Sequence, residues 1–398
     1  MRRKEEVTGQ SMAPAEQSAG LPHFSLLGGP LHRFGTQLGL VRADTNTLPL
    51  GMVIGAILGG VWVILNLTRG ENPFVLSNAA TLTRLFLAIP LLFLSETILN
   101  PRLTQFIGSV VRSGIVPGEA LPRFSALIKR VTDRENGWVP DVVCLAGALT
   151  LTWIMPQLRG LRLNWGVQDP IFVAPTLAQG WYWIVCLTVF RFLLLRWVWR
   201  LCVWTFVLWV LSRMPLRLQP SHPDGVAGLG NLEVVHEHFA PLILNISVVL
   251  ASSFAVDIAA GTLTVEEVYP RLGVVLILDA VLFIGPLMFF LPKLAACRVQ
   301  GIIDYADLSE RYARTFEAKW FHTRSPTNEP LLGSPDIQSL ADLGAGFNRV
   351  RDMRWVPMGK ALLVRLMIAA ILPFLPLLLF KYHIITLSTK LITRLIGL

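Results

Sequence analysis

Long apolar runs are the feature that most constrains this chain. Several stretches of about 17 to 30 residues contain few charges, which is typical of helices that cross a bilayer. Backbone polar groups in lipid must be satisfied locally, so these runs are expected to be helices rather than barrel strands. Charged residues make up only 15% of the chain, against roughly 25% in soluble domains. The sequence therefore predicts an all-α integral membrane protein.

The runs predict a polytopic transmembrane helical bundle of about seven spans. Three belong to a first transmembrane unit, residues 50–156, and are placed at about 50–67, 78–99 and 140–155. Three belong to a second unit, residues 239–380, and are placed at about 239–259, 272–291 and 361–380. Apolar residues at helical spacing predict cytoplasmic amphipathic helices in an insert of each unit, at 100–137 and 293–357.

The ends and the middle of the chain differ from these units. Residues 1–49 are expected to be a partly disordered cytoplasmic segment, and 381–398 an amphipathic tail. Residues 179–238 combine an Arg- and Trp-rich apolar run with a polar loop. Because the run 181–211 lacks Gly, Pro, Asn and Asp, it predicts one continuous helix of ~46 Å, longer than a hydrocarbon core of ~30 Å.

Basic residues divide unevenly between the two sides of the predicted spans. With the N-terminus inside, the inside segments hold 23 of the 35 Lys and Arg residues, the outside segments hold seven, and five lie within spans. Positive charge concentrates in cytoplasmic loops, so the pattern predicts a cytoplasmic N-terminus and a C-terminus outside. The net charge of +9 is attributed to anionic lipid head groups rather than to nucleic acid.

Three charged residues fall inside predicted spans, namely Arg84, Arg191 and Asp279. An isolated charge near the bilayer centre costs at least ~2.5 kcal/mol on the insertion scale, so each is expected to face the bundle interior. We expect Asp279 to pair with Arg191 or Arg84. Such a pair would either fix helix register or line a pathway, and two arginines for one aspartate would favour anions. Misplaced span boundaries are the remaining alternative.

Two further arginines, Arg196 and Arg200, lie four residues apart near the predicted cytoplasmic interface. Long basic side chains at this depth reach toward lipid phosphates, and that is the expectation here. Their spacing does not fit a voltage sensor, which needs arginines at every third position.

The densest polar cluster follows this helix and contains His222, Asp224, His236 and His238. Its spacing matches neither a zinc motif nor a phosphate-binding glycine loop. The favoured interpretation is a tight structural turn in which Asp224 and His222 bond to loop backbone. Metal binding is the less favoured alternative.

A weak internal repeat is a further hypothesis. Pro90-Leu-Leu-Phe in the second span is similar to Pro286-Leu-Met-Phe in the sixth, and an arginine follows each proline after 12 residues. The two units would then be parallel copies joined by the Arg-rich helix, a plan known among transporters.

The His222-Pro-Asp…Gly-Leu-Gly230 loop after an Arg- and Trp-rich helix is one of two distinctive patterns, and Asp336-Ile-Gln-Ser-Leu-Ala-Asp-Leu before the last span is the other. With them the chain resembles uncharacterised bacterial multi-pass membrane proteins over about residues 50–380. The resemblance implies no activity.

The intramembrane charges and the repeat favour a channel or transporter-like protein of the bacterial inner membrane, for a small solute with anions among the candidates. The alternative is a membrane-anchored signalling or scaffold protein that acts through its cytoplasmic helices. A weaker alternative is a metal-dependent enzyme at the membrane interface that uses the four loop residues. We expect no catalytic site, resident metal or cofactor, and leave a homo-oligomer open. The lipid bilayer is the expected partner.

Overall fold

The computed structural model describes residues 24–41, 45–159, 176–321 and 335–381. Within these ranges the regular elements are helical and no strand occurs, so the prediction of an all-α fold is confirmed. Five helical stretches are long and apolar enough to cross a membrane, and a sixth is added if α6 and α7, which meet at a bend of 51°, form one span. The protein is an all-α membrane bundle.

The first part of the chain builds one side of the bundle. A short helix, α2, precedes the first membrane helix, α3, and the second membrane stretch follows as a series of helical segments without a turn. Their bounds are Gly29–Gln37 for α2, Leu48–Leu67 for α3, Leu76–Asn78 for η1, Ala79–Leu82 for α4, Thr83–Ala88 for η2 and Ile89–Arg112 for α5.

The middle of the chain supplies two antiparallel neighbours, α7 and α9, which pack along each other. The predicted continuous helix at 181–211 is confirmed, because α8, η3 and α9 follow one another without a break. Their bounds, with those of the helices before them, are Leu121–Glu135 for α6, Val139–Arg159 for α7, Leu177–Trp181 for α8, Tyr182–Cys186 for η3 and Leu187–Arg213 for α9. Since α9 contacts α5, α6, α7 and η5, it lies at the centre of the bundle.

The last part of the chain forms the other side of the bundle and its projection. The elements are Gly230–Glu237 for α10, Ala240–Ala259 for α11, Val265–Asp279 for α12, Ala280–Ile284 for η4, Gly285–Phe290 for η5, Leu291–Trp320 for α13, Pro335–Arg351 for α14, Lys360–Ile371 for α15, Leu372–Leu377 for η6 and Leu378–Lys381 for α16. The described part of α14 begins at Pro335.

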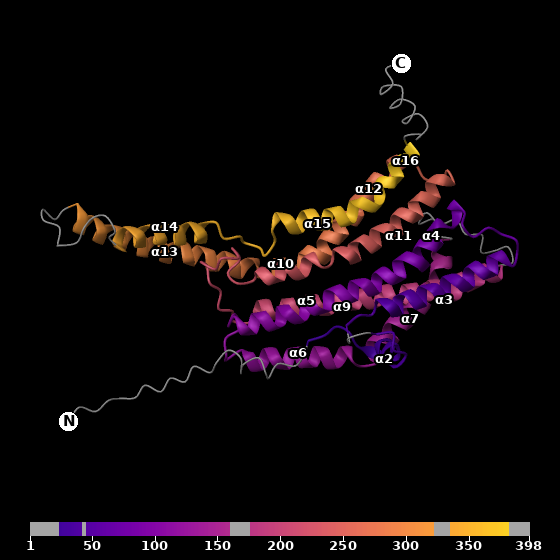
Figure 1. Ribbon diagram of the computed structural model, residues 1–398, viewed down its shortest axis with the longest axis horizontal. Coiled ribbons are helices and arrows are strands. Elements are labelled where there is room, and N and C mark those ends of the chain that lie inside the picture. Colours follow the sequence, from indigo (N-terminus) through magenta and orange to yellow (C-terminus); the bar gives the residue numbers. More distant parts are fainter. Residues whose placement is uncertain (1–23, 42–44, 160–175, 322–334, 382–398) are drawn as a thin grey trace, which may run out of the picture.

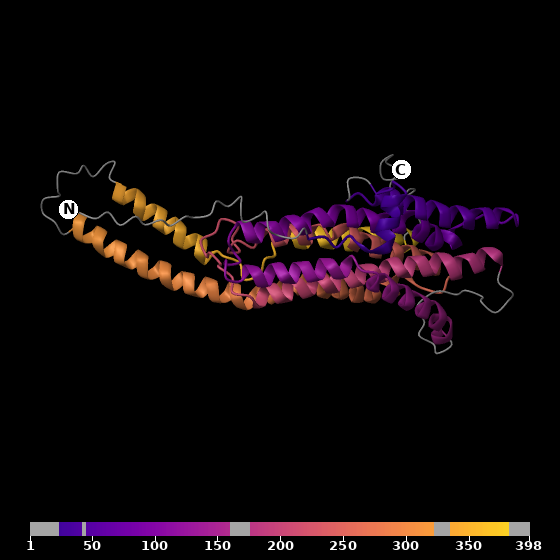
Figure 2. The ribbon, with the colours of Figure 1, turned by 90° about the horizontal axis from the view of Figure 1, so that it is seen from below.

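Figures 1 and 2 show an elongated bundle from which α13 and α14 project side by side as a helical hairpin. We call this end of the bundle the hairpin end, and the end with the turn at 260–264 the short-loop end. The root of the hairpin is anchored, because Leu294 is buried and Gly301 packs against Pro220 and Val350. At 1.5 Å per residue, the 30 residues of α13 reach ~45 Å, so most of the hairpin lies beyond the bundle.

Glycines recur every four residues on α3 and allow close approach of the second membrane stretch. A Cβ atom at Gly55 would lie 2.5 Å from the Leu85 carbonyl oxygen, and Gly51 and Gly59 meet phenylalanine side chains in the same way. A larger residue at Gly55 would therefore push the two helices apart.

Three helical segments are π-helical, and each involves a polar membrane residue. Arg84 lies in η2, Tyr182 begins η3, and Asp279 immediately precedes η4. In η2 and η4 a proline follows closely, Pro90 and Pro286, and proline both lacks an N–H group and crowds the carbonyl four residues earlier. Wider π turns accommodate that crowding and are frequent at functional sites.

The packing of the two units differs. In the first unit α3 packs along α5, whereas in the second α11 packs along α15 and touches α12 only slightly. The similar π segment and proline in the second and sixth predicted spans are therefore not accompanied by a common arrangement of three helices. Residues 1–23 and 42–44 of the segment 1–49, which is expected to be partly disordered, lie outside the described residues, as does the expected amphipathic tail beyond Lys381.

Candidate functional site

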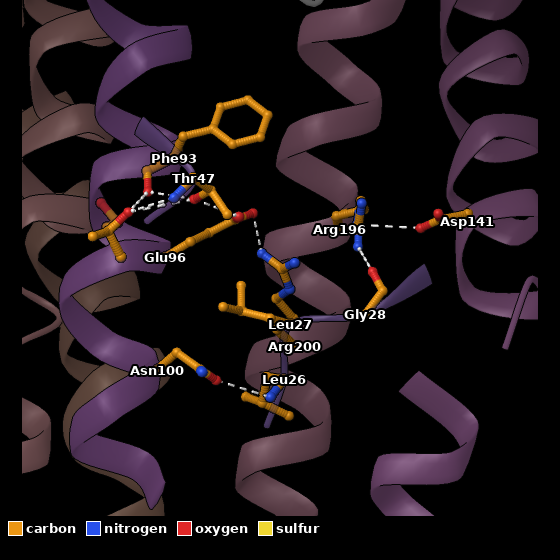
Figure 3. Close-up of polar contacts among 12 residues, drawn as sticks. Leu26, Leu27, Gly28, Thr47, Phe93, Glu96, Asn100, Asp141, Arg196 and Arg200 are labelled. Carbon is orange, nitrogen blue, oxygen red and sulfur yellow. Dashed lines mark hydrogen bonds and ion pairs between the residues drawn. The ribbon is translucent and has the colours of Figure 1, made fainter. Parts of the chain in front are cut away.

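Arg196 on α9 is buried and neutralised by neighbouring elements. Its Nε lies 3.2 Å from Asp141 Oδ1 at the start of α7, and its Nη2 donates to the Gly28 carbonyl at 2.7 Å. Figure 3 shows the guanidinium between these two groups. The arginine thus ties the segment before α2 and the helix α7 to the central helix.

Arg200, one helical turn along α9, is only 4% exposed and forms an ion pair with Glu96 of α5. The Thr47 hydroxyl donates to the other Glu96 oxygen at 3.2 Å, and the Arg200 guanidinium lies 5.5 Å from the ring of Trp197. The adjoining cavity measures about 10 Å³, room for about one water molecule. We call Glu96, Asp141, Arg196 and Arg200 the ion-pair cluster.

The expectation that Arg196 and Arg200 reach toward lipid phosphates is wrong. Both face the interior because α5 and α7 each bring a carboxylate to the same level of α9. Glu96 and Asp141 lie near the ends of their predicted spans, so by sequence alone they resemble interfacial charges. One feature of the sequence could have indicated the pairing. Two arginines near the inner end of one predicted span are matched by one carboxylate near the inner end of each of two other spans.

The predicted pairing of Asp279 is also wrong. Arg84 donates to the Tyr182 hydroxyl at 2.5 Å and to Ser253 Oγ at 2.8 Å, while Arg191 donates to Thr152 Oγ1 at 2.8 Å. Hydroxyl groups on directly packed helices therefore satisfy both arginines. Asp279 lies on α12, at the edge of the bundle, where its Oδ2 has no hydrogen-bond partner in the described part of the chain.

Asp279 belongs to a group of buried polar side chains on α11 and α12 that have atoms without hydrogen-bond partners among the described residues. We call them the orphan set, and its members are Asn245, Ser247, Asp257 and Asp279. Neither polar atom of the Asn245 amide has a partner in the described part of the chain, although the residue is 0% exposed. Of the two carboxylates in the set, Asp257 has cations as electrostatic neighbours within the described ranges, Arg271 and Arg84, and Asp279 has none there.

Asn245 and Asp279 lie at a similar depth. Each is 14 residues from the turn that joins α11 to α12, counted from 245 to 259 and from 265 to 279. At 1.5 Å per residue that is ~21 Å along each helix, so the two residues lie at a similar height above the turn. Asp257 lies close to the turn itself, so the orphan set extends from the short-loop end into the membrane interior.

The loop after α9 is a tight turn built around Asp224, as the sequence predicts. Its carboxylate accepts hydrogen bonds from the N–H groups of Val226, Gly228 and Gly230 at 2.9, 3.2 and 2.8 Å, and His222 Nδ1 lies 2.9 Å away. Burial raises the pKa of Asp224, but these hydrogen bonds outweigh it, and the net pKa lies below its usual value.

Arg354, which follows α14, forms hydrogen bonds to this loop from a segment outside it. Its guanidinium bonds to Glu233 Oε2 at 2.8 Å and to the Asp224 carbonyl at 3.2 Å, and its own N–H donates to the Gly225 carbonyl. Glycine at 225 and 228 permits positive φ angles of 68° and 99°. The loop therefore joins the hairpin root to the bundle.

The loop histidines lie apart. His236 is buried, with Nδ1 2.6 Å from the Phe283 carbonyl and Nε2 accepting from Trp204, whereas His238 bonds to the Val234 carbonyl at the surface. The described residues contain no group of three or more His, Cys, Asp or Glu side chains that could hold a metal ion. The geometry brings His222 together with Asp224 but not with His236 or His238.

Comparison with known proteins adds no assignment: no family model matches the chain, and neither a curated protein nor a solved structure matches it.

Proposed function

We propose that the protein carries a small polar solute across the membrane along α11 and α12. The observation that supports this proposal is the orphan set, whose four buried side chains have unpartnered polar atoms inside apolar membrane helices. A buried polar atom without a partner costs about 1–3 kcal/mol. Intramembrane polar groups of this kind commonly mark pathways for ions or substrates, and a passing guest would supply the missing partners.

Irregular helices support the same proposal. The π segment η4 and the 3-10 segment η5 directly follow Asp279, so the helical hydrogen-bond ladder changes register at that residue. Transporters commonly form substrate sites where membrane helices are interrupted near the midplane. The π segment η2 contains Arg84, which contacts Tyr182 and Ser253 and also acts electrostatically on Asp257. Ser253 and Asp257 are four residues apart, so they lie on the same side of α11.

The orphan atoms also bear on the class of solute. The expectation of an anion rested on Arg84 and Arg191 outnumbering Asp279. Arg84 and Arg191 keep their charges but are held by hydroxyl groups, and Arg84 acts electrostatically on Asp257. Asp279, the deeper carboxylate of the orphan set, has no cation as an electrostatic neighbour among the described residues. We therefore favour a small cation or a proton over an anion. The proposed setting is the bacterial inner membrane with the hairpin end in the cytoplasm, in line with the charge bias of the loops.

Flux into proteoliposomes tests this function. The full-length protein would be reconstituted, and uptake of H⁺, Na⁺, K⁺ and Cl⁻ compared for the native chain and Asp279→Asn. We expect cation or proton flux in the native protein and at least a tenfold loss in the variant. Asp342→Asn, an exposed carboxylate on the projecting α14, is the matched control and should keep native flux. Flux no greater than in empty liposomes, or equal flux in Asp279→Asn, would refute the proposal.

A second candidate function is favoured by the hairpin of α13 and α14, which projects from the bundle (Figure 1). A membrane-anchored scaffold would use α13 and α14 to contact another protein. Replacing residues 305–346 with a short Gly-Ser linker keeps the buried Val350 and the root of the hairpin. Under the transport proposal the shortened protein retains flux, whereas a scaffold would lose its cellular partner while the bundle stays intact.

A further inference from the structure

A groove between α6 and α9 has no part in the proposed pathway. Its volume is about 620 Å³, within the range of about 300–1,000 Å³ that is usual for ligand sites. One wall is polar and comes from the second half of α6, with Arg130 and Arg134. The other wall is largely apolar and comes from α9, with Val203 and Phe206. The groove is therefore amphiphilic.

The positive charge of the groove is available to a ligand. Arg130 and Arg134 are four residues apart, so they lie next to each other on one face of α6, and both are exposed. Two carboxylates also line the groove. That of Glu135 is buried and accepts from Trp199 Nε1 at 2.7 Å, which leaves Asp133 as the exposed acid. Arg123 and Lys129 add further positive charge elsewhere on α6, whose net charge is positive.

The groove lies at the edge of the lipid zone. Trp138, three residues after Glu135, is 66% exposed, and exposed tryptophans mark membrane interfaces. The helix α7 begins directly after it and presents an apolar exposed face that consists of Val139, Val142, Val143, Leu145 and Leu149. Acyl chains that cover this face bring their head groups to the level of Arg130 and Arg134.

We propose that this groove binds the head group of an anionic phospholipid from the leaflet at the hairpin end. The lipid phosphate lies against Arg130 and Arg134, and the upper part of an acyl chain packs on Val203 and Phe206. Basic pockets beside membrane helices bind anionic head groups in this way. The binding places the lipid contact on α6 instead of on Arg196 and Arg200, which the ion-pair cluster buries.

Native mass spectrometry of the delipidated full-length protein tests the site, with phosphatidylglycerol and phosphatidylcholine as probes. We expect phosphatidylglycerol to bind at least tenfold more tightly, and Arg130→Gln/Arg134→Gln to lose at least tenfold in that affinity. Arg123→Gln/Lys129→Gln removes the same charge from the same helix outside the groove and should stay within twofold of native affinity. Equal binding of the two lipids, or equal losses in the two double variants, would overturn the proposal.

A second measurement distinguishes binding of the whole lipid from binding of a phosphate group alone. Thermal unfolding in detergent is followed with phosphatidylglycerol or with inorganic phosphate at the same concentration. The apolar wall predicts a rise in Tm with the lipid only. A rise of the same size with inorganic phosphate would show that the acyl chain contributes nothing, which contradicts the proposed ligand.

Discussion

The ion-pair cluster and the orphan set are two polar regions of one membrane bundle that differ in how their charges are satisfied. In the cluster, Arg196 and Arg200 each have a carboxylate partner, and further hydrogen bonds come from Thr47 and the Gly28 carbonyl. In the orphan set, Asn245 and Asp279 have atoms with no partner among the described residues. The ion pairs of the cluster hold helices together, whereas the unpartnered atoms of the orphan set can still form hydrogen bonds with a ligand.

The two regions also differ in their position in the bundle. The cluster surrounds the central helix α9, where α5, α7 and the segment before α2 converge. Three members of the orphan set lie on α11, which packs against α15, α5 and η2, and only Asp279 lies on α12, which has few close neighbours among the described elements. Carboxylates neutralise both arginines on α9, although the buried Trp197 Nε1 beside Arg200 has no partner among the described residues. Each member of the orphan set has at least one polar atom with no hydrogen-bond partner within the same part of the chain. Each of the following experiments would break or sharpen this contrast.

The largest effect is expected for Arg200→Met. The substitution leaves Glu96 buried without its cation, and breaking a buried pair in this way costs about 3–5 kcal/mol of unfolding free energy. Unfolding by SDS titration in mixed micelles would measure it. Arg213→Met, at the exposed end of the same helix, is the control and should change little. If Arg200→Met were as stable as that control, the cluster would not hold the helices together.

An intermediate effect of opposite sign is expected for Asn245→Leu. Removing an amide with two unpartnered atoms should raise the free energy of unfolding by about 1–3 kcal/mol. The matched control is Asn100→Leu, since Asn100 is also buried but accepts a hydrogen bond from the Leu26 N–H at 3.1 Å. That variant should be destabilised. The same SDS titration applies, and destabilisation of both variants would mean that Asn245 has a structural partner.

The smallest effect on the free energy of unfolding is expected for a substitution of Asp224. This carboxylate lies outside the membrane spans and accepts hydrogen bonds from backbone N–H groups. Its pKa is lowered in the folded protein, so its stabilising contribution is present above the ordinary carboxyl pKa and is lost as pH falls through the folded value. At pH 7 Asp224→Asn should cost about 1 kcal/mol, reduced by solvent screening. Thermal unfolding would be measured for the native protein and for Asp224→Asn between pH 7 and pH 3. The difference in stability between the two proteins should become smaller as the pH falls. A difference independent of pH would contradict a role for the charge.

Prediction from sequence succeeded where the cause is local. The run 181–211 is one helix because it contains no residue that ends a helix. The loop at 222–230 is a turn because Asp224 can accept from N–H groups two, four and six residues ahead. Each of these features depends on residues that are neighbours in the chain.

Partner choice among the charged residues could not be predicted in the same way. Asp279 was expected to pair with an arginine because an unpaired charge is costly in lipid. In the structure the two arginines instead donate hydrogen bonds to the hydroxyl groups of Tyr182, Ser253 and Thr152. Arg196 and Arg200 were expected at the lipid surface, yet Asp141 and Glu96 reach them from other helices. Spacing along the chain contains no information on which helix faces which.

The sequence by itself determined that this protein is a helical membrane bundle, since apolar runs in lipid must satisfy their own backbone. It also determined where most helices begin and end. Only the tertiary structure decided which buried charges are paired and which polar groups remain without partners. The physical reason is that an ion pair or hydrogen bond needs two groups within about 3–4 Å, and helix packing sets that distance.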